Sequence, residues 1–154
     1  MEGKMKVKFK YGIRTYSGKL DELVFSSYRK GKLCIAREFV YPRITPHNNE
    51  IGSVGKNLGL LWAEGSDEFK SQLAMYAKLN ATENVPANQW APNAYALWVQ
   101  LMHKWAADHD DVDLKTLTVE DFAVTGITVS TVKNCVLNGY LKPVTGYDTM
   151  TAAF

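Results

Sequence analysis

The sequence predicts an α+β fold, in which an N-terminal antiparallel β-hairpin or small sheet is followed by a helical layer and a C-terminal helix pair. Three observations predict it. Apolar residues alternate with lysines near the start, apolar residues recur at helical spacing in the middle, and two short capped segments stand near the end. We expect one compact domain with a basic β-hairpin region over 1–46, a helical region over 47–107, and an acidic loop, helix pair and tail over 108–154.

The composition is that of a globular domain. The 154 residues are 46% hydrophobic and 22% charged, which suffices for a core without disulfides. No apolar run approaches the roughly 20 residues of a membrane helix, so no membrane partner is expected. The first residues have no apolar signal-peptide core. Cys34 and Cys135 match no metal-binding spacing, which predicts reduced, packed thiols and a cytoplasmic origin.

A period of two in the side chains predicts a first strand from Met5 to Tyr11. Its apolar residues are Met5, Val7, Phe9 and Tyr11, and the lysines that alternate with them are Lys4, Lys6, Lys8 and Lys10. Because strand side chains alternate between faces, the lysines share one face. They form either a contact surface or a solvated face that protects an edge strand from aggregation.

A hairpin is predicted next. The runs 23–28 and 33–40 flank Arg29-Lys30-Gly31-Lys32, in which glycine supplies a turn residue with positive φ. An earlier turn is expected at Ser17-Gly18. The segment 41–46 contains two prolines, which lack the amide donor of a paired strand, and is therefore predicted to be a connector.

Helical spacing predicts three helices in the middle region. The apolar residues of the first are Ile51, Val54, Leu58, Leu61 and Trp62. Gly52, Gly55 and Gly59 form a smooth stripe on it, where we expect a tight helix contact. Ser66 is the predicted N-cap of the second helix, and the third is expected to begin near Pro92.

The C-terminal region begins with an acidic loop over 107–113. Thr118 and Asp121 have the spacing of a capping box and predict the start of a short helix. Thr128 or Ser130 is expected to cap a last helix that ends at Asn138-Gly139. The tail after Lys142 is expected to dock on this chain or on a neighbouring subunit.

Charge is distributed unevenly along the chain. Residues 1–43 contain eleven Lys and Arg and four Asp and Glu, a net charge of +7, whereas residues 44–154 contain seven and twelve, a net charge of −5. A basic front indicates contact with phosphate or with an acidic protein surface, including head-to-tail self-association. Solvated lysines are the alternative. The predicted partner-binding residues are Lys4, Lys6, Lys8, Lys10, Lys19, Arg29, Lys30 and Lys32.

Motifs for catalysis and metal binding are missing. A calcium loop starting at Asp108 fails at positions five, six and twelve, which are Val112, Asp113 and Val119. The three histidines share no zinc-site spacing, and the sequence has neither a nucleophile motif nor a phosphate-binding loop. We therefore expect no enzymatic activity, catalytic residue, metal or cofactor, and the sequence identifies no small-molecule substrate.

The segments 117–123, 126–132 and 136–139 resemble the helix-turn-helix of the lac-repressor family. The resemblance implies that Ser130, Thr131, Lys133 and Asn134 face the bases or phosphates of DNA. The interval between Asp121 and Gly126 is one residue shorter than in that family, and Lys133 and Lys142 are the nearby cations, so phosphate binding would be weak. The alternative function is therefore a small DNA-binding regulator.

A second resemblance extends over much of the chain. The residues that carry it are Gly18-Lys19, Val24-Phe25, Gly31-Lys32, Arg37, Pro42, Thr45, Trp62, Ser66-Asp67-Glu68-Phe69-Lys70, Tyr76-Ala77, Ala94-Tyr95 and Trp98. They resemble short uncharacterised proteins of phages and prophages of Bacteroidetes-like hosts, which implies a phage context. We predict a non-enzymatic virion-associated or assembly protein, located in the virion or the host bacterial cytoplasm. Its expected partners are other virion proteins and further copies of itself, with nucleic acid as the alternative.

Overall fold

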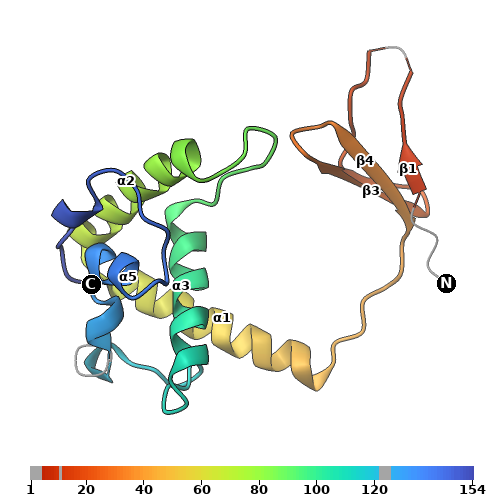
Figure 1. Ribbon diagram of the computed structural model, residues 1–154. Coiled ribbons are helices and arrows are strands. Elements are labelled where there is room, and N and C mark those ends of the chain that lie inside the picture. The colour runs from red at the N-terminus through yellow and green to blue at the C-terminus, as the bar shows by residue number, and fades with distance from the viewer. Residues whose placement is uncertain (1–4, 11, 122–125) are drawn as a thin grey trace. The chain divides into compact units, whose positions relative to one another are not determined.

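The computed structural model describes residues 5–10, 12–121 and 126–154, and it confirms the α+β class (Figure 1). The chain divides into two compact units, whereas the sequence pattern predicts one domain. Unit 1 comprises Met1–Arg43 and Pro86–Trp90, and unit 2 comprises Ile44–Val85 and Ala91–Phe154. Within the described ranges, no helix is long and apolar enough to cross a membrane.

Unit 1 contains an antiparallel sheet of β1 (Met5–Val7), β2 (Gly18–Leu20), β3 (Leu23–Tyr28) and β4 (Leu33–Glu38), in the order β1-β4-β3-β2. The predicted first strand is wrong beyond Val7. Val7 pairs with Cys34, and β4 begins only one residue before Cys34, so the following lysines have no partner strand. The predicted residue Tyr11 lies outside the described residues.

The predicted hairpin of β3 and β4 is confirmed. Gly31 has φ 79° and donates its amide hydrogen to the carbonyl of Tyr28 at 3.1 Å. Arg29 and Lys30 also have positive φ, 53° and 55°, which residue type alone does not predict. The hairpin ends at Glu38 rather than at residue 40, two residues after Ala36, the last partner of β1.

One face of the sheet carries the small core of unit 1. Phe25, Cys34 and Ala36 are buried there. Phe9 and Tyr16, from the segment between β1 and β2, lie against Phe25 with ring centroids 6.0 Å and 5.5 Å away. The segment after Val7 therefore covers this face of the sheet.

Unit 2 is helical, with α1 (Pro46–Glu64), α2 (Asp67–Glu83) and α3 (Ala94–Asp108). Thr45, Ser66 and Asn93 cap these helices, each accepting a hydrogen bond from the amide three residues later. The predicted cap Ser66 is thus confirmed. The third helix begins two residues after Pro92 and extends through Asp108, into the predicted acidic loop.

The predicted contact at the glycine stripe of α1 is wrong. A Cβ added at Gly52 or Gly55 would have no neighbour within 4 Å, and one at Gly59 would meet only the Tyr95 hydroxyl at 3.7 Å. The exposed fraction of Ile51 is 59%. The buried residues of α1 are Leu58 and Leu61, and the partly buried Val54 also packs against the core, so α1 contacts the core from Val54 onwards.

After α3, residues 119–121 are helical, and the further elements whose bounds lie within the described residues are η1 (Gly126–Val129), α5 (Val132–Leu137) and η2 (Tyr147–Thr149). Thr118 and Asp121 make the predicted reciprocal capping bonds, 3.3 Å and 3.2 Å from amide to side-chain oxygen. Thr131 caps α5, so the predicted cap at Thr128 or Ser130 is wrong. Gly139, with φ 78°, ends α5 as predicted.

The C-terminal tail docks on unit 2, one of the two predicted outcomes. The Phe154 ring stacks on Trp98 at 5.8 Å and meets the Phe69 ring edge to face at 5.3 Å. The Phe154 amide donates to the carbonyl of Ser130 at 2.9 Å, and the Ala152 amide donates to Gln72 Oε1 at 2.9 Å. The tail therefore closes one side of the helical core.

Candidate binding surface of unit 1

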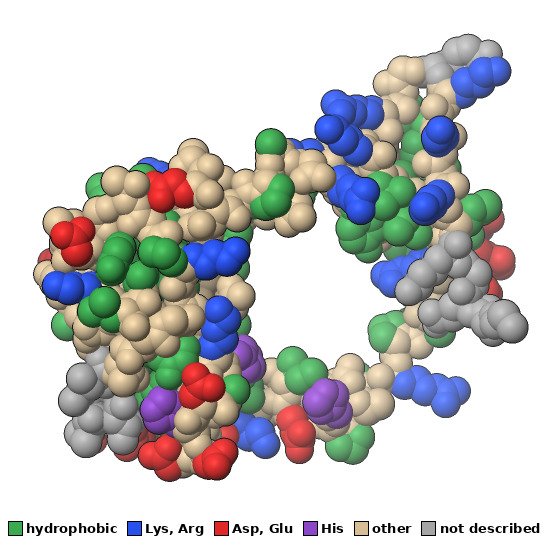
Figure 2. All heavy atoms as spheres, in the orientation of Figure 1, with side chains coloured by type: hydrophobic (Ala, Val, Ile, Leu, Met, Phe, Trp, Pro, Cys, Tyr) green, Lys and Arg blue, Asp and Glu red, His purple; other side chains and the backbone are tan. Residues whose placement is uncertain are grey.

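The two units differ in charge. Because 86–90 has no charged residue, unit 1 has the net charge of +7 of residues 1–43, and unit 2 has −5. Figure 2 shows Lys and Arg side chains over the sheet of unit 1 and several Asp and Glu side chains gathered at the lower end of unit 2. The boundary between the units therefore coincides with the change in charge along the sequence.

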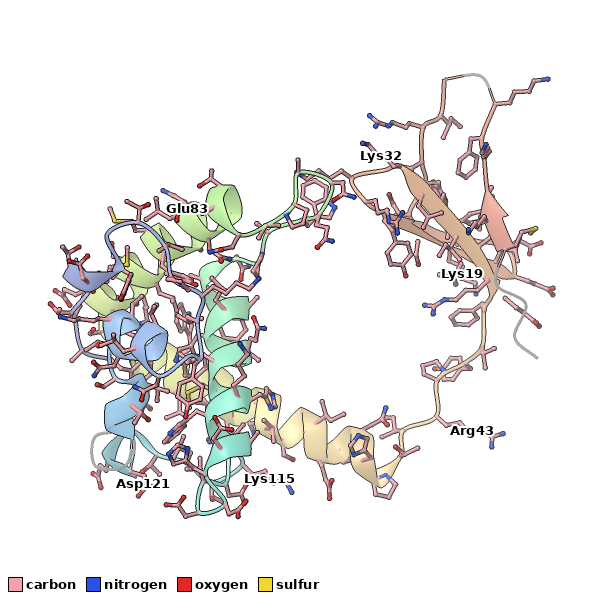
Figure 3. All side chains as sticks on the ribbon, in the orientation of Figure 1. Lys19, Lys32, Arg43, Glu83, Lys115 and Asp121 are labelled. Carbon is pink, nitrogen blue, oxygen red and sulfur yellow. The ribbon has the colours of Figure 1, made fainter. Side chains whose placement is uncertain are left out.

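The predicted partner-binding cations lie on several elements of unit 1. Lys6 is in β1, Lys8 and Lys10 follow β1, Lys19 is in β2, and Arg29, Lys30 and Lys32 are in the turn between β3 and β4. All seven are exposed, and Lys4 lies outside the described residues. Figure 3 labels Lys19 on the sheet and Lys32 at the turn of the hairpin. Because β1 ends at Val7, these cations do not form the single lysine face of a long strand.

The face of the sheet opposite Phe25 is its open face. From the register, this open face consists of Lys6, Lys19, Val24, Ser26, Tyr28, Leu33, Ile35 and Arg37, none of which is buried. Val24 pairs with Lys19 on β2 and with Arg37 on β4. Two cations therefore flank an apolar residue in one row across three strands.

A groove begins at this row and continues along the segment that follows β4. It has a volume of about 690 Å³, and it is lined by Val24, Arg37, Glu38, Phe39, Val40, Tyr41, Pro42 and Arg43. The Phe39 amide donates to the carbonyl of Glu22 at 2.7 Å, which holds the start of this segment at the end of the β3–β4 pair. Pro42 has no amide hydrogen, so the chain leaves the sheet and its side chains line the groove.

The groove combines cations with aromatic rings. The Lys19 Nζ lies 4.0 Å from the centroid of the Phe39 ring, and the Tyr41 ring meets Phe39 edge to face at 6.3 Å. Tyr41 has an exposed fraction of 82%. Arg43 projects from the segment after β4 (Figure 3). Such a surface suits a ligand that carries negative charge next to flat apolar groups.

Sequence reasoning missed this groove, because it assigned 41–46 to a connector. Two signals pointed to it. Phe39-Val40-Tyr41 is an apolar run directly before a proline, and two arginines, Arg37 and Arg43, bracket that run. Neither signal identifies a site without the sheet register, because only the register places Lys19 and Arg37 in one row.

The residues implied by the helix-turn-helix resemblance lie at the start of α5, which has six residues. Thr131 Oγ1 accepts the Asn134 amide at 3.1 Å, the Ser130 carbonyl accepts the Phe154 amide, and the Lys133 amide donates to the Met150 carbonyl. The tail therefore lies against the first turn of α5. The segment between Asp121 and Gly126 lies outside the described residues.

The titratable groups buried in unit 2 keep their protons at neutral pH. Burial raises the pKa of the Cys135 thiol to about 12, and it raises the pKa of the Tyr76 hydroxyl to about 12. The Tyr76 hydroxyl donates to the carbonyl of Lys142 at 2.7 Å. Tyr140 also has a raised pKa, caused first by burial and then by the charge of Asp108. Such groups are poor nucleophiles and poor bases near pH 7.

Among the residues that the structure describes, no three His, Cys, Asp and Glu side chains come together to hold a metal ion. The acidic residues of 108–121 are instead exposed, and they form an acidic patch of unit 2 composed of Asp108, Asp110, Asp111, Asp113, Glu120 and Asp121. Asn57 Nδ2 donates to the carbonyls of Leu114 and Leu117 at 3.0 Å and 2.8 Å, which ties this segment to α1.

No protein-family model, curated protein or solved structure matches the chain.

Proposed function

We propose that the protein is a non-enzymatic virion-associated or assembly component that acts through protein–protein contacts made by unit 1. The observation that carries this proposal is the segregation of charge, +7 on unit 1 and −5 on unit 2. Unit 1 of one copy repels unit 1 of a second copy, because both are positive, but it attracts the negative unit 2 of that second copy. The partners that fit are acidic surfaces of other virion proteins and the acidic patch of another copy.

The exposure of the cations supports this proposal. Lys30 and Lys32 are exposed in the turn between β3 and β4, and Asp110 and Asp111 are exposed in the acidic patch. The resemblance of the sequence to phage proteins supports a phage context, and the proposal therefore includes a location in the virion or in the cytoplasm of the bacterial host. For the DNA-binding regulator, the structure provides no supporting observation, and it stays a prediction.

A charge swap tests the proposal. Sedimentation velocity at low salt is expected to show self-association of the wild type that disappears near 1 M salt, where the screening distance falls to about 3 Å. The variant Lys30→Glu/Lys32→Glu and the variant Asp110→Lys/Asp111→Lys should each sediment as monomers, and their mixture should associate again.

The matched control is Lys56→Glu/Lys78→Glu, which reverses two exposed lysines of unit 2 and changes the net charge by the same amount. It should associate like the wild type. Mass spectrometry of purified phage particles is the second measurement. A strictly monomeric wild type that is also absent from purified particles would contradict the proposal.

A further inference from the structure

We infer that the groove at the end of β4 binds single-stranded nucleic acid, with Tyr41 as the surface on which a base stacks and with Arg37 and Arg43 as phosphate contacts. This inference concerns a ligand and residues different from those of the proposed protein–protein contacts, which depend on the turn between β3 and β4. The two proposals are therefore tested by different variants.

Tyr41 has the properties of a stacking residue. Its exposed fraction is 82%, so most of its ring is accessible. The contact with Phe39, at 6.3 Å and an interplanar angle of 88°, orients the ring. Because Pro42 follows, the backbone of Tyr41 is restricted to extended conformations, and less entropy is lost when a ligand binds.

Two arginines, Arg37 and Arg43, line the same groove as this ring. Arg37 and Lys19 share one row of the open face, separated by Val24. Arg43 lies two residues after Tyr41, and Glu38 is the one acidic residue among the groove-lining residues. Arginine forms paired hydrogen bonds with phosphate oxygens, so phosphates on either side of a stacked base would find a guanidinium.

The flat rings favour a nucleic acid over an acidic peptide. The carboxylates of an acidic peptide do not stack on an exposed aromatic ring, whereas every nucleic-acid base has a flat face that stacks on such a ring. They also favour a single strand over a duplex, because the bases of a duplex stack on each other and are not accessible to Tyr41. Phosphate contacts and stacking carry no base code, so binding should tolerate different sequences.

Fluorescence anisotropy of the full chain with a labelled oligothymidylate of about 20 nucleotides tests the inference. Tyr41→Ala is expected to weaken binding about tenfold, because one base loses its stacking partner. Tyr41→Phe keeps the ring and should keep the wild-type affinity. Arg43→Ala should reduce the slope of log affinity against log salt by about 0.7, the value for one phosphate contact on a single strand.

The matched controls are Tyr28→Ala, at the last residue of β3, and Arg29→Ala, in the turn that follows, which remove the same residue types from the same unit outside the groove. Both should weaken binding less than their counterparts at Tyr41 and Arg43. Equal losses would mean that diffuse positive charge holds the oligonucleotide, and they would overturn the inference. Equal affinity for a duplex of the same length would also overturn it, as would displacement by polyglutamate at an equal concentration of charge. Neither result bears on self-association through Lys30 and Lys32.

Discussion

The sheet unit and the helical unit are built on different physical bases. Among the described residues, unit 1 buries three hydrophobic residues, Phe25, Cys34 and Ala36, whereas unit 2 buries twenty-one in one cluster. The largest side chains of that cluster, Trp98 and Trp105, are fully buried. Burial of apolar area is the main source of folding free energy. We therefore expect unit 2 to have the larger free energy of unfolding. In unit 1, most of the described side chains lie at the surface.

This difference matters for function because a binding surface needs exposed side chains. Unit 1 exposes Tyr41 and all the predicted cations that lie within the described residues. In unit 2, by contrast, the buried Tyr76 hydroxyl is used for an internal hydrogen bond to the carbonyl of Lys142. A substitution at an exposed position of unit 1 is therefore expected to change its surface more than its stability. A substitution in the core of unit 2 is expected to change its stability.

The largest effect is expected from removing a core aromatic residue of unit 2. Trp98 is completely buried between Trp62 and Phe154, so Trp98→Ala should lower the free energy of unfolding by about 3–5 kcal/mol. Urea unfolding followed by far-UV circular dichroism measures it. Met75→Ala, at an exposed position of α2, is the control and should stay within about 0.5 kcal/mol of the wild type. A similar loss in both variants would contradict the assigned core.

Alkaline pH should destabilise unit 2 through its two raised pKa values. The pKa of Cys135 rises from 9.0 to about 12, and that of Tyr76 rises from 10.0 to about 12. Between the usual pKa and the raised pKa of each group, the unfolded chain has released the proton while the folded chain keeps it. The free energy of unfolding therefore falls as the pH rises through this range. Below about pH 9 both states are protonated and nothing is lost.

Urea unfolding at several pH values measures this dependence. The free energy of unfolding is expected to fall by up to about 1.4 kcal/mol per pH unit for each group, between its usual pKa and its raised pKa. Cys135→Ala should flatten the dependence that starts near pH 9, and Tyr76→Phe should flatten the part that starts near pH 10. Unchanged slopes in both variants would show that other groups determine the alkaline limit.

The two cysteines report on the units separately, because both are free and buried, Cys34 in unit 1 and Cys135 in unit 2. A unit with few buried apolar residues opens locally more often than a unit with many. Cys34 should therefore react with a thiol reagent at least about tenfold faster than Cys135 in the native protein. The single variants Cys34→Ala and Cys135→Ala assign the two rates. Faster labelling of Cys135 would reverse the stability order of the units.

Several local features were predicted correctly from the sequence because neighbouring residues determine them, although the cap of α5 lies at Thr131 rather than at Thr128 or Ser130. Gly31 in the hairpin turn and Ser66 at the start of α2 have the predicted roles. Features that depend on contacts with residues distant in the sequence were not predicted. The first strand ends at Val7 because β4 begins at Leu33, and the glycine stripe of α1 has the spacing for a helix contact but no helix against Gly52 or Gly55.

The candidate groove shows the same limit. Its residues were visible in the sequence, but Arg37 joins Lys19 only through the pairing of both strands with Val24. The fold class could be predicted because alternation and helical spacing are properties of short windows. A site assembled from two strands and the following segment requires the register, which depends on all of the turns between them.

Effects of opposite sign are expected from two glycines of unit 2, Gly55 in the interior of α1 and Gly65 at its C-cap. A Cβ at Gly65 would lie 2.7 Å from Cε2 of Phe154, whereas a Cβ at Gly55 would meet nothing within 4 Å. Gly65→Ala must displace the Phe154 ring, and it should destabilise unit 2 by about 1–3 kcal/mol. Gly55→Ala should instead stabilise it by about 0.5–1 kcal/mol, since alanine favours a helix interior.

Thermal unfolding of the two glycine variants measures both signs in one experiment. Truncation of Phe154 to alanine provides the control, because once the ring is gone Gly65→Ala should cost little more. Equal costs of Gly65→Ala with and without the Phe154 ring would mean that the tail does not pack there. Destabilisation by Gly55→Ala would instead show that the surface of α1 around Gly55 is covered in solution.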